Sequence, residues 1–238
     1  MPLSGQYIPL PCVPEITGEH LCALCAEQGG SCCATDPATG HLSFPLSVPE
    51  WRRLTPWSAL ATDAVPADNA AFEKSERDAL HAAQKLAARP PQTAAAHSFP
   101  PANGDACCQV WPNTPDFILS MGALFPKEKD RVAELFPKKG SHFSLRLRQD
   151  GACVFLGQDG CRLPRYARPW YCLLFPVWMT EGRPGLFAAQ GCLIASRATN
   201  PAHAVRLLDV DIALLREYFS HLRSDWGFAV TQATTRES

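Results

Sequence analysis

The sequence predicts a single α+β domain over residues 1–238, rich in loops, with short β-hairpins and a long C-terminal helix. Three observations lead to this fold class. A chain of 238 residues is long enough to bury one substantial core. Its 22 prolines limit long regular elements, because each proline removes a backbone donor and fixes φ. Its 11 cysteines lie mostly in two clusters, so we expect bound metal to staple the domain and to replace part of the missing secondary structure.

The first clear helix signal follows a proline-punctuated arm. Residues 1–21 are expected to run extended into the first cysteine cluster. Ser47–Glu50 (SVPE) then matches a capping box, with serine at the N-cap, proline in the first turn and glutamate at N3. We expect a short helix whose Val48, Trp51 and Leu54 face the core.

Residues 57–113 are predicted to be an insertion in the main domain. Alanine, proline, aspartate and threonine dominate this range. Its one clear element is a helix from about Asn69 to Ala88, which Pro90 and Pro91 end. The stretch 90–104 is expected to be a loop.

One helix and two hairpins are predicted in the next part of the chain. The helix covers residues 126–137, between two prolines. Residues 143–147 alternate apolar and polar side chains, which predicts a half-buried strand with its odd-numbered residues inward. Residues 152–156 are expected to return as its antiparallel partner. Segments 173–179 and 186–189 predict the second hairpin.

The strongest helix signal covers residues 200–228. Asn200 caps this helix and Pro201 opens it. Seven apolar residues then recur in alternating steps of three and four: Val205, Leu208, Ile212, Leu215, Phe219, Leu222 and Trp226. Such a stripe is typical of a helix that packs on the core of its own domain. The alternative is a seam for a protein partner or a homodimer.

Composition and charge narrow the function classes. A net charge of −1 gives no general attraction to nucleic acid or to anionic lipid. The N-terminus has no signal-peptide pattern, and no stretch approaches the roughly 20 apolar residues of a membrane span. The predicted compartment is therefore the reducing cytoplasm, where clustered cysteines usually bind metal or carry redox chemistry.

The cysteine pattern also favours metal over disulfides. The count of 11 is odd, so disulfides cannot use every thiol. Two pairs of neighbours occur, Cys32-Cys33 and Cys107-Cys108. A disulfide between neighbours is strained, because their Cα atoms lie about 3.8 Å apart instead of the usual 5.5–6 Å or so. Disulfides and scattered thiols remain the alternatives.

Eight cysteines are the candidate metal ligands: Cys22, Cys25, Cys32, Cys33, Cys153, Cys161, Cys172 and Cys192. The first two have CxxC spacing, which lets two thiolates of one turn share a metal, although a redox dithiol is the competing interpretation. Thiolates suit both zinc and iron, including iron–sulfur clusters, and eight of them suffice for one or two centres. Arg162, Arg165 and Arg168 are expected to donate hydrogen bonds to such a centre, the alternative being a solvated basic face.

Other cysteines and histidines fit this pattern less well. Those not assigned to the site are Cys12, Cys107, Cys108, His20, His142 and His203.

The cysteine spacing resembles a known family. The CxxC…CC start, followed by a serine-containing stretch leading to Glu50, is similar to the YkgJ family of zinc- or iron-chelating cysteine-cluster proteins. The runs CVFLGQDGCRLP from Cys153 and RPWYCLLFP from Arg168 resemble that family's C-x-F-L…GC…RP-x-x-C-x-x-FP signature. The resemblance covers about residues 20–56 and 125–195. It implies a metal-chelating domain that uses the cysteines given above, although the gap between the CxxC and CC pairs is longer than in the family's compact form.

We therefore expect a zinc- or iron-chelating protein that binds one or two metal centres through clustered thiolates. A second class is an iron-dependent or redox enzyme, because the cysteine signature also resembles that of the flagellin lysine N-methylase group. No radical-SAM CxxxCxxC run or glycine-rich nucleotide loop supports that class. A third class is a zinc-stabilised scaffold for protein interaction. For Trp170, Phe175 and Trp178, burial around the metal is favoured over a pocket lining.

Overall fold

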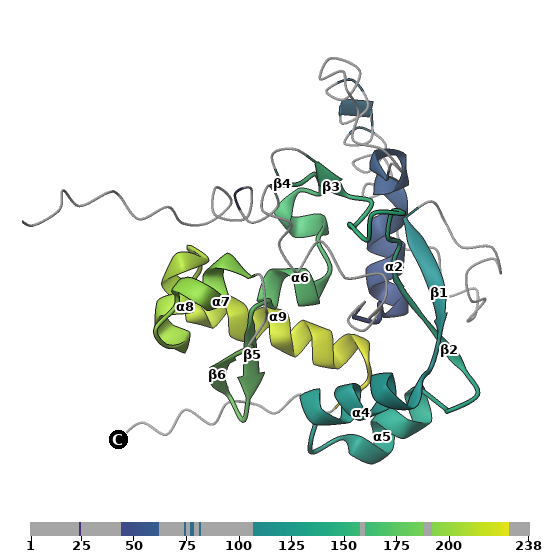
Figure 1. The fold of residues 1–238 in the computed structure, drawn as a ribbon, viewed down its shortest axis with the longest axis vertical. Helices are drawn as coiled ribbons and strands as arrows, with labels where there is room; N and C mark the ends of the chain where they lie inside the picture. The colour runs from purple at the N-terminus through teal and green to yellow at the C-terminus, as the bar shows by residue number, and fades with distance from the viewer. Residues whose placement is uncertain are drawn as a thin grey trace, which may run out of the picture.

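The computed structural model describes residues 44–61, 107–157, 160–187 and 192–228, together with residues 24, 74, 77, 78 and 81, which are helical. The described elements are short helices and two-stranded antiparallel pairs, which confirms a mixed α+β fold. They gather around the long helix α9, Ile212–Asp225 (Figure 1). None of the described helices is long and apolar enough to cross a membrane. The arm over 1–21 and most of the helix predicted over 69–88 lie outside the described residues.

Helix α2, Val48–Leu54, begins as the sequence predicts but buries a different face. Ser47 is its N-cap and forms the complete capping box with Glu50. Leu54 is fully buried, whereas Val48 is 40% exposed. The expectation that Val48 faces the core is therefore wrong. Glu50 lies inside instead, because its carboxylate accepts a hydrogen bond from the backbone of Trp170 in a distant segment.

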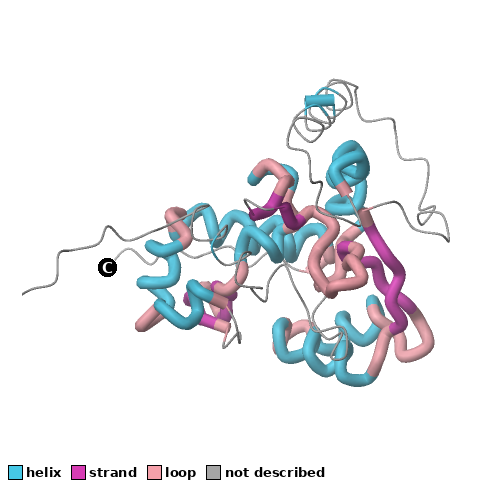
Figure 2. Tube along the Cα trace, turned by 45° about the horizontal axis from the view of Figure 1, so that its top comes forward, coloured by secondary structure: helices cyan, strands magenta, loops and turns pink. Residues whose placement is uncertain are grey.

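Strand β2, Ser141–Leu145, pairs with a strand that the sequence did not predict. This partner is β1, Cys108–Pro112, and the antiparallel register places Cys108 opposite Leu145. Figure 2 shows β1–β2 as the longest of three separate strand pairs. The partner predicted at 152–156 forms only an isolated bridge, between Leu147 and Cys153. Because β1 falls within residues 57–113, the C-terminal end of the predicted insertion forms part of the β1–β2 pair.

The two faces of β2 are both covered. Phe143 and Leu145 pack against a core cluster on one side. On the other side His142 is buried and stacks on the ring of Phe117, with the ring centroids 3.8 Å apart. Ser144 is also completely buried. The expectation that only the odd-numbered face is inward is wrong, because the even-numbered His142 and Ser144 are buried as well, and a helix covers His142.

That covering helix is α4, Pro115–Leu124, which the sequence did not predict. Thr114 caps it by accepting a hydrogen bond from the backbone N–H of Phe117. The next helix, α5, Lys129–Leu135, lies within the range predicted for a helix over 126–137.

Short elements then lead from the second cysteine cluster into the predicted second hairpin. They are β3 (Leu156–Gly157), β4 (Gly160–Cys161), the 3₁₀ helix η2 (Arg165–Ala167), α6 (Trp170–Leu174), β5 (Val177–Thr180) and β6 (Arg183–Leu186). A hairpin forms in this part of the chain as predicted, but its strands are 177–180 and 183–186 instead of 173–179 and 186–189, and its turn residues Glu181 and Gly182 have φ of 53° and 76°. Positive φ at both positions is what a two-residue hairpin turn requires.

The helix predicted over 200–228 is broken in two. Helix α8, Pro201–Leu207, starts at the Asn200 cap as predicted. Asp209 then adopts a φ of 54°, and Asp211 caps α9 by accepting from the backbone N–H of Ala213 at 2.8 Å. The prediction of a single long C-terminal helix is therefore wrong. The apolar stripe still packs inward, as a core stripe should.

The described apolar side chains form two core clusters. The first joins α4, α5, β5, α8 and α9, and includes Trp178 and Phe175, which are 5% and 9% exposed. Both rings are buried, whereas Trp170 is half-buried, and burial around a metal stays a prediction. Helix α7, Leu193–Arg197, contributes Ile194 to the same cluster. The second cluster joins α2, the 3₁₀ helix η1 (Thr55–Leu60), β1 and residues 154–167.

Candidate metal centre

Four of the eight candidate ligands lie within the described residues, and Cys22, Cys25, Cys32 and Cys33 lie outside them. The four described cysteines differ in exposure: Cys153 and Cys161 are half-buried, Cys172 is exposed, and Cys192 is buried. Within the described part of the chain, no three His, Cys, Asp or Glu side chains are grouped so that they could hold a metal ion. The described cysteines therefore do not form a complete centre by themselves.

Cys153 and Cys161 belong to one neighbourhood. The backbone N–H of Leu156 donates to the carbonyl of Cys153 at 2.9 Å. Leu156 in turn faces Cys161 across the β3–β4 pair. Both cysteines pack against the second core cluster. The hairpin thus brings these two sequence-predicted thiols to the same side of the domain.

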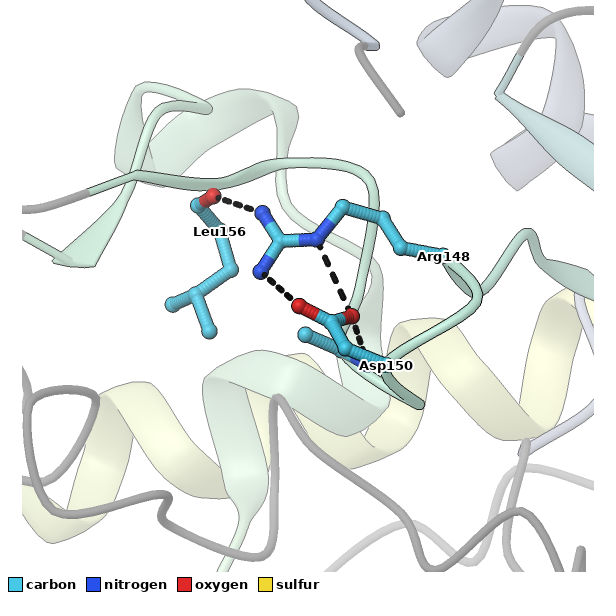
Figure 3. Close-up of polar contacts among 4 residues, drawn as sticks. Arg148, Asp150 and Leu156 are labelled. Carbon is cyan, nitrogen blue, oxygen red and sulfur yellow. Dashed lines mark hydrogen bonds and ion pairs between the residues drawn. The ribbon is translucent and has the colours of Figure 1, made fainter. Parts of the chain in front are cut away.

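A single guanidinium fixes the segment that carries these two cysteines. Arg148 is buried, and its Nη1 donates to the carbonyl of Leu156 at 2.9 Å (Figure 3). Its Nε and Nη2 donate to the two carboxylate oxygens of Asp150 at 3.2 and 3.0 Å. Asp150 also accepts from the backbone N–H of Ala152 at 3.0 Å. The bonds from Arg148 hold the pKa of Asp150 below its ordinary value.

Sequence reasoning did not identify Arg148 as part of the site. Its signal is the RQDG turn at 148–151, in which arginine and aspartate lie two residues apart. A planar fork that meets a carboxylate with two donors is the geometry that arginine provides and lysine does not. Arg148 therefore ties the turn before Cys153 to the hairpin that carries Cys161.

Two of the three arginines predicted near the cluster support backbone around it. Arg162 is buried, which lowers its pKa, and its Nη1 donates to the carbonyl of Leu60 at 3.4 Å. Arg168 donates from Nε to the carbonyl of Leu163 at 2.9 Å, and from Nη2 to that of Cys161 at 3.5 Å. Arg165 lies half-buried in η2. Arg168 therefore fixes the backbone at one candidate ligand.

Cys172 occupies a different setting from the one expected. Because Cys172 follows Arg168 and Pro169, the sequence pattern predicts a thiol aimed inward from a turn or kink, but Cys172 lies on α6 and is exposed. Leu173 and Leu174 bury the opposite part of this short helix. The inward orientation is therefore wrong for this residue. An exposed thiol can still meet donors from another segment.

The start of α6 is anchored by Glu50. The backbone N–H of Trp170 donates to Oε1 of Glu50 at 2.8 Å. The other oxygen, Oε2, accepts from the backbone N–H and the hydroxyl of Ser47 at 2.9 and 2.8 Å. Glu50 is only 1% exposed, and this burial raises its pKa above the ordinary value. The capping residue of α2 thus also positions the helix that carries Cys172.

Cys192 lies apart from the other described ligands. It is the N-cap of α7, where its Sγ accepts from the backbone N–H of Ala195 at 3.5 Å. It belongs to the first core cluster, whereas Cys153 and Cys161 pack against the second. The structure therefore groups two of the four described candidates and does not place Cys192 with them.

The described segment that could bind a metal carries thiol sulfur atoms, which are soft ligands, on a backbone held in place by other side chains. Residues 153–172 carry three candidate thiols, and arginine and glutamate side chains hold the backbone between them. No family model, curated protein or solved structure matches this chain. The functional inference therefore depends on these residues and their contacts.

Proposed function

We propose that this chain is a thiolate metal-binding protein that holds zinc or iron at one or two centres. One observation carries the proposal. Cys153, Cys161 and Cys172 lie in one segment whose backbone is fixed by side chains from elsewhere, and none of the three is fully buried. Both properties favour metal binding, because a fixed backbone holds the thiols in place, and a thiol that is not fully buried ionises more readily and can be reached by the metal.

The remaining donors come from the first cysteine cluster. Structural zinc takes four ligands, and the described part of the chain groups fewer than three donors at any point. Cys22, Cys25, Cys32 and Cys33 supply the missing thiolates in this proposal. The centre then staples the N-terminal cluster to the β3–β4 hairpin and α6, which accounts for a fold with few long elements.

The donor set suits soft or borderline metals. Thiolates select zinc and iron–sulfur clusters over magnesium or calcium. A bound zinc ion would supply a structural cross-link, and a bound iron–sulfur cluster would supply an electron-transfer centre. In either case Arg148, Arg168 and Glu50 keep their positions, because each of them bonds to protein groups.

The scaffold alternative receives less support. It requires the C-terminal helix to present its apolar stripe to a partner. Leu215 and Leu222 of that stripe are fully buried within the first core cluster, and Val205 belongs to the same cluster. The stripe is already used by the chain's own core.

Anaerobic purification from a reducing cytoplasm, followed by elemental analysis and a visible spectrum, tests the proposal. A colourless protein with stoichiometric zinc identifies a zinc centre, and broad thiolate-to-iron absorption with stoichiometric iron identifies an iron centre. The proposal fails if neither metal co-purifies and thiol titration finds most cysteines oxidised.

A further inference from the structure

Two carboxylates from different helices meet at one hydroxyl group. Oε2 of Glu50 on α2 lies 2.8 Å from Oγ of Ser47, and Oδ2 of Asp225 at the end of α9 lies 3.4 Å from the same Oγ. The hydroxyl has one proton, so it donates to one carboxylate at a time. The two carboxylate oxygens are therefore at most about 6 Å apart, a separation at which each negative charge disfavours the other.

Both carboxylates hold the first residue of α6. The backbone N–H of Trp170 donates to Oε1 of Glu50 at 2.8 Å, and its indole Nε1–H donates to Oδ2 of Asp225 at 2.8 Å. Glu50 is buried, so its carboxylate exchanges these partners for water only if the helices separate. A proton gained by either carboxylate therefore changes the hydrogen bonding at the start of α6.

Arg53 supplies positive charge to both carboxylates. Its guanidinium interacts electrostatically with Glu50 and Asp225, and its Nη2 donates to the carbonyl of Arg168 at 3.1 Å. The two negative charges thus share the positive charge of Arg53, and burial raises the pKa of Glu50 above its ordinary value. Both effects favour the uptake of a proton. The other titratable groups of α6 and α9 close to Trp170 are His221, Glu217, Tyr218, Tyr171 and Cys172.

We propose that Glu50, Ser47 and Asp225 form a pH-sensitive latch on α6, in which the two carboxyl groups take up one proton between them. When Glu50 holds the proton, it donates to Oγ of Ser47, and the Ser47 hydroxyl turns to donate to Asp225. When Asp225 holds the proton, both bonds reverse and Ser47 donates to Glu50. No bond between heavy atoms forms or breaks. The latch contains no cysteine, so it goes beyond the proposed metal binding and does not depend on it.

Two resonances of Trp170 report on the latch in proton–nitrogen correlation spectra of the full-length, reduced protein. The indole N–H reports on Asp225 and the backbone N–H reports on Glu50, and W170F identifies the indole signal by its loss. All measurements use an H221Q background, because the imidazole of His221 stacks on the Trp170 ring with the centroids 5.1 Å apart and its protonation would move the same signals.

A shared proton requires both signals to titrate together. On titration from about pH 8 to about pH 4, we expect the indole and backbone resonances of Trp170 to move with the same midpoint, which belongs to the pair of carboxyl groups. Two different midpoints would show that the carboxyl groups titrate independently. Signals that do not move over this range would also overturn the proposal.

Removing one carboxyl group measures the coupling. E50Q is expected to lower the midpoint of the indole signal by about one pH unit or more, because Asp225 then titrates without the neighbouring negative charge. E217Q is the matched control, since it removes an exposed carboxylate of the same helix that lies outside the latch, and it is expected to keep the midpoint. An E50Q midpoint equal to that of E217Q would contradict the proposal.

D225N provides the reciprocal test and decides the question if E50Q does not fold. The backbone N–H of Trp170 then follows Glu50 alone, and its midpoint is expected to fall for the same electrostatic reason. A D225N protein in which this midpoint equals that of the H221Q parent would overturn the latch. The metal content of the protein enters neither comparison, so failure of the latch leaves the proposed metal binding standing, and the reverse holds as well.

Discussion

The indole Nε1–H of Trp170 donates a 2.8 Å hydrogen bond to Oδ2 of Asp225. This bond joins the first residue of α6 to the last residue of α9. The hydroxyl of Ser47 reaches the same oxygen at 3.4 Å, and the guanidinium carbon of Arg53 lies 4.0 Å from the centroid of the Trp170 ring. Three helices therefore meet at a side chain two positions before Cys172.

Replacing Trp170 with phenylalanine is expected to reduce the free energy of unfolding by about 1.5–3 kcal/mol, because the variant lacks the hydrogen bond to a charged carboxylate. W111F is a matched control. The Nε1 of Trp111 is buried and has no hydrogen-bond partner among the described residues, so its removal costs no such bond. Urea denaturation measures both changes. Equal losses of stability in the two variants would contradict the role given to the Trp170–Asp225 bond.

Replacing Glu50 with alanine is expected to destabilise the domain by about 3 kcal/mol or more, because the buried N–H groups of Ser47 and Trp170 lose their acceptor. E50Q keeps one carbonyl oxygen and is expected to lose less. E134A is the control, since Glu134 pairs with Arg131 on the surface at 2.7 Å, where such pairs contribute about 0–1 kcal/mol. The account of Glu50 fails if E50A is no less stable than E134A.

His142 provides a pH-dependent contribution to stability. Its Nδ1 lies 2.8 Å from Oδ1 of Asn113, whose Nδ2 donates to the carbonyl of Pro137 at 3.0 Å. This orientation of the amide makes Nδ1 of His142 the donor of a neutral ring. Burial lowers the pKa of His142 from 6.5 to about 4.

The lowered pKa fixes the sign of the pH effect. Between pH 6.5 and about 4, the unfolded chain binds a proton at His142 that the folded protein does not bind. Stability is therefore expected to fall as the pH is lowered through this window, and H142Q is expected to remove this part of the fall. Urea denaturation at the two ends of the window measures it, with exposed His81→Gln as the control. An unchanged pH dependence in H142Q would contradict the assignment.

Replacing Arg148 with lysine tests the support of the candidate centre. Lysine cannot make the fork to Asp150 and also reach the carbonyl of Leu156. We expect R148K to lose about 1–3 kcal/mol of stability and to show faster alkylation of Cys153 and Cys161 in the folded protein. Cys172 reports on general loosening and is expected to react at its wild-type rate. Unchanged rates at the two half-buried cysteines would exclude this supporting role.

Local chemistry explains which elements could be predicted from the sequence. The capping box needs only Ser47 and Glu50, three residues apart, so its pattern is complete within one turn. The turn of β5–β6 similarly depends on Glu181 and Gly182. Both features follow from neighbours along the chain, and the capping box was predicted correctly, whereas the hairpin was predicted with a longer turn and a second strand three residues too late.

Partners distant in sequence explain the errors. β1 is a strand because β2 pairs with it. The first residue of β2, Ser141, lies 33 positions after the first residue of β1, Cys108. The C-terminal helix breaks at Asp209, where the apolar stripe continues across the break and conceals it. Glu50 is buried because of Trp170. The periodic pattern of apolar residues along the chain does not show which distant segments come into contact.

In the candidate centre, too, features set by neighbouring residues could be predicted and features set by distant partners could not. The QDG run at 158–160 predicts a tight turn just before Cys161, and Cys161 lies in β4, the second strand of the β3–β4 pair. Such turn signals did not predict that Cys172 is exposed on a helix, or that Cys107 and Cys108 are buried in the cluster against which Cys153 and Cys161 pack. The exposure of Cys172 depends on which face of α6 packs on α9. The burial of Cys107 and Cys108 depends on the pairing of β1 with β2.

The central claim is that clustered thiolates hold a metal, and the metal-to-protein ratio of C161S against C12S tests it most directly. Both proteins are purified anaerobically in parallel with the wild type and analysed for zinc and iron. We predict that C12S keeps the wild-type ratio and that C161S loses most of its metal. Equal ratios in the two variants, or a wild-type protein that contains neither metal, would contradict the account.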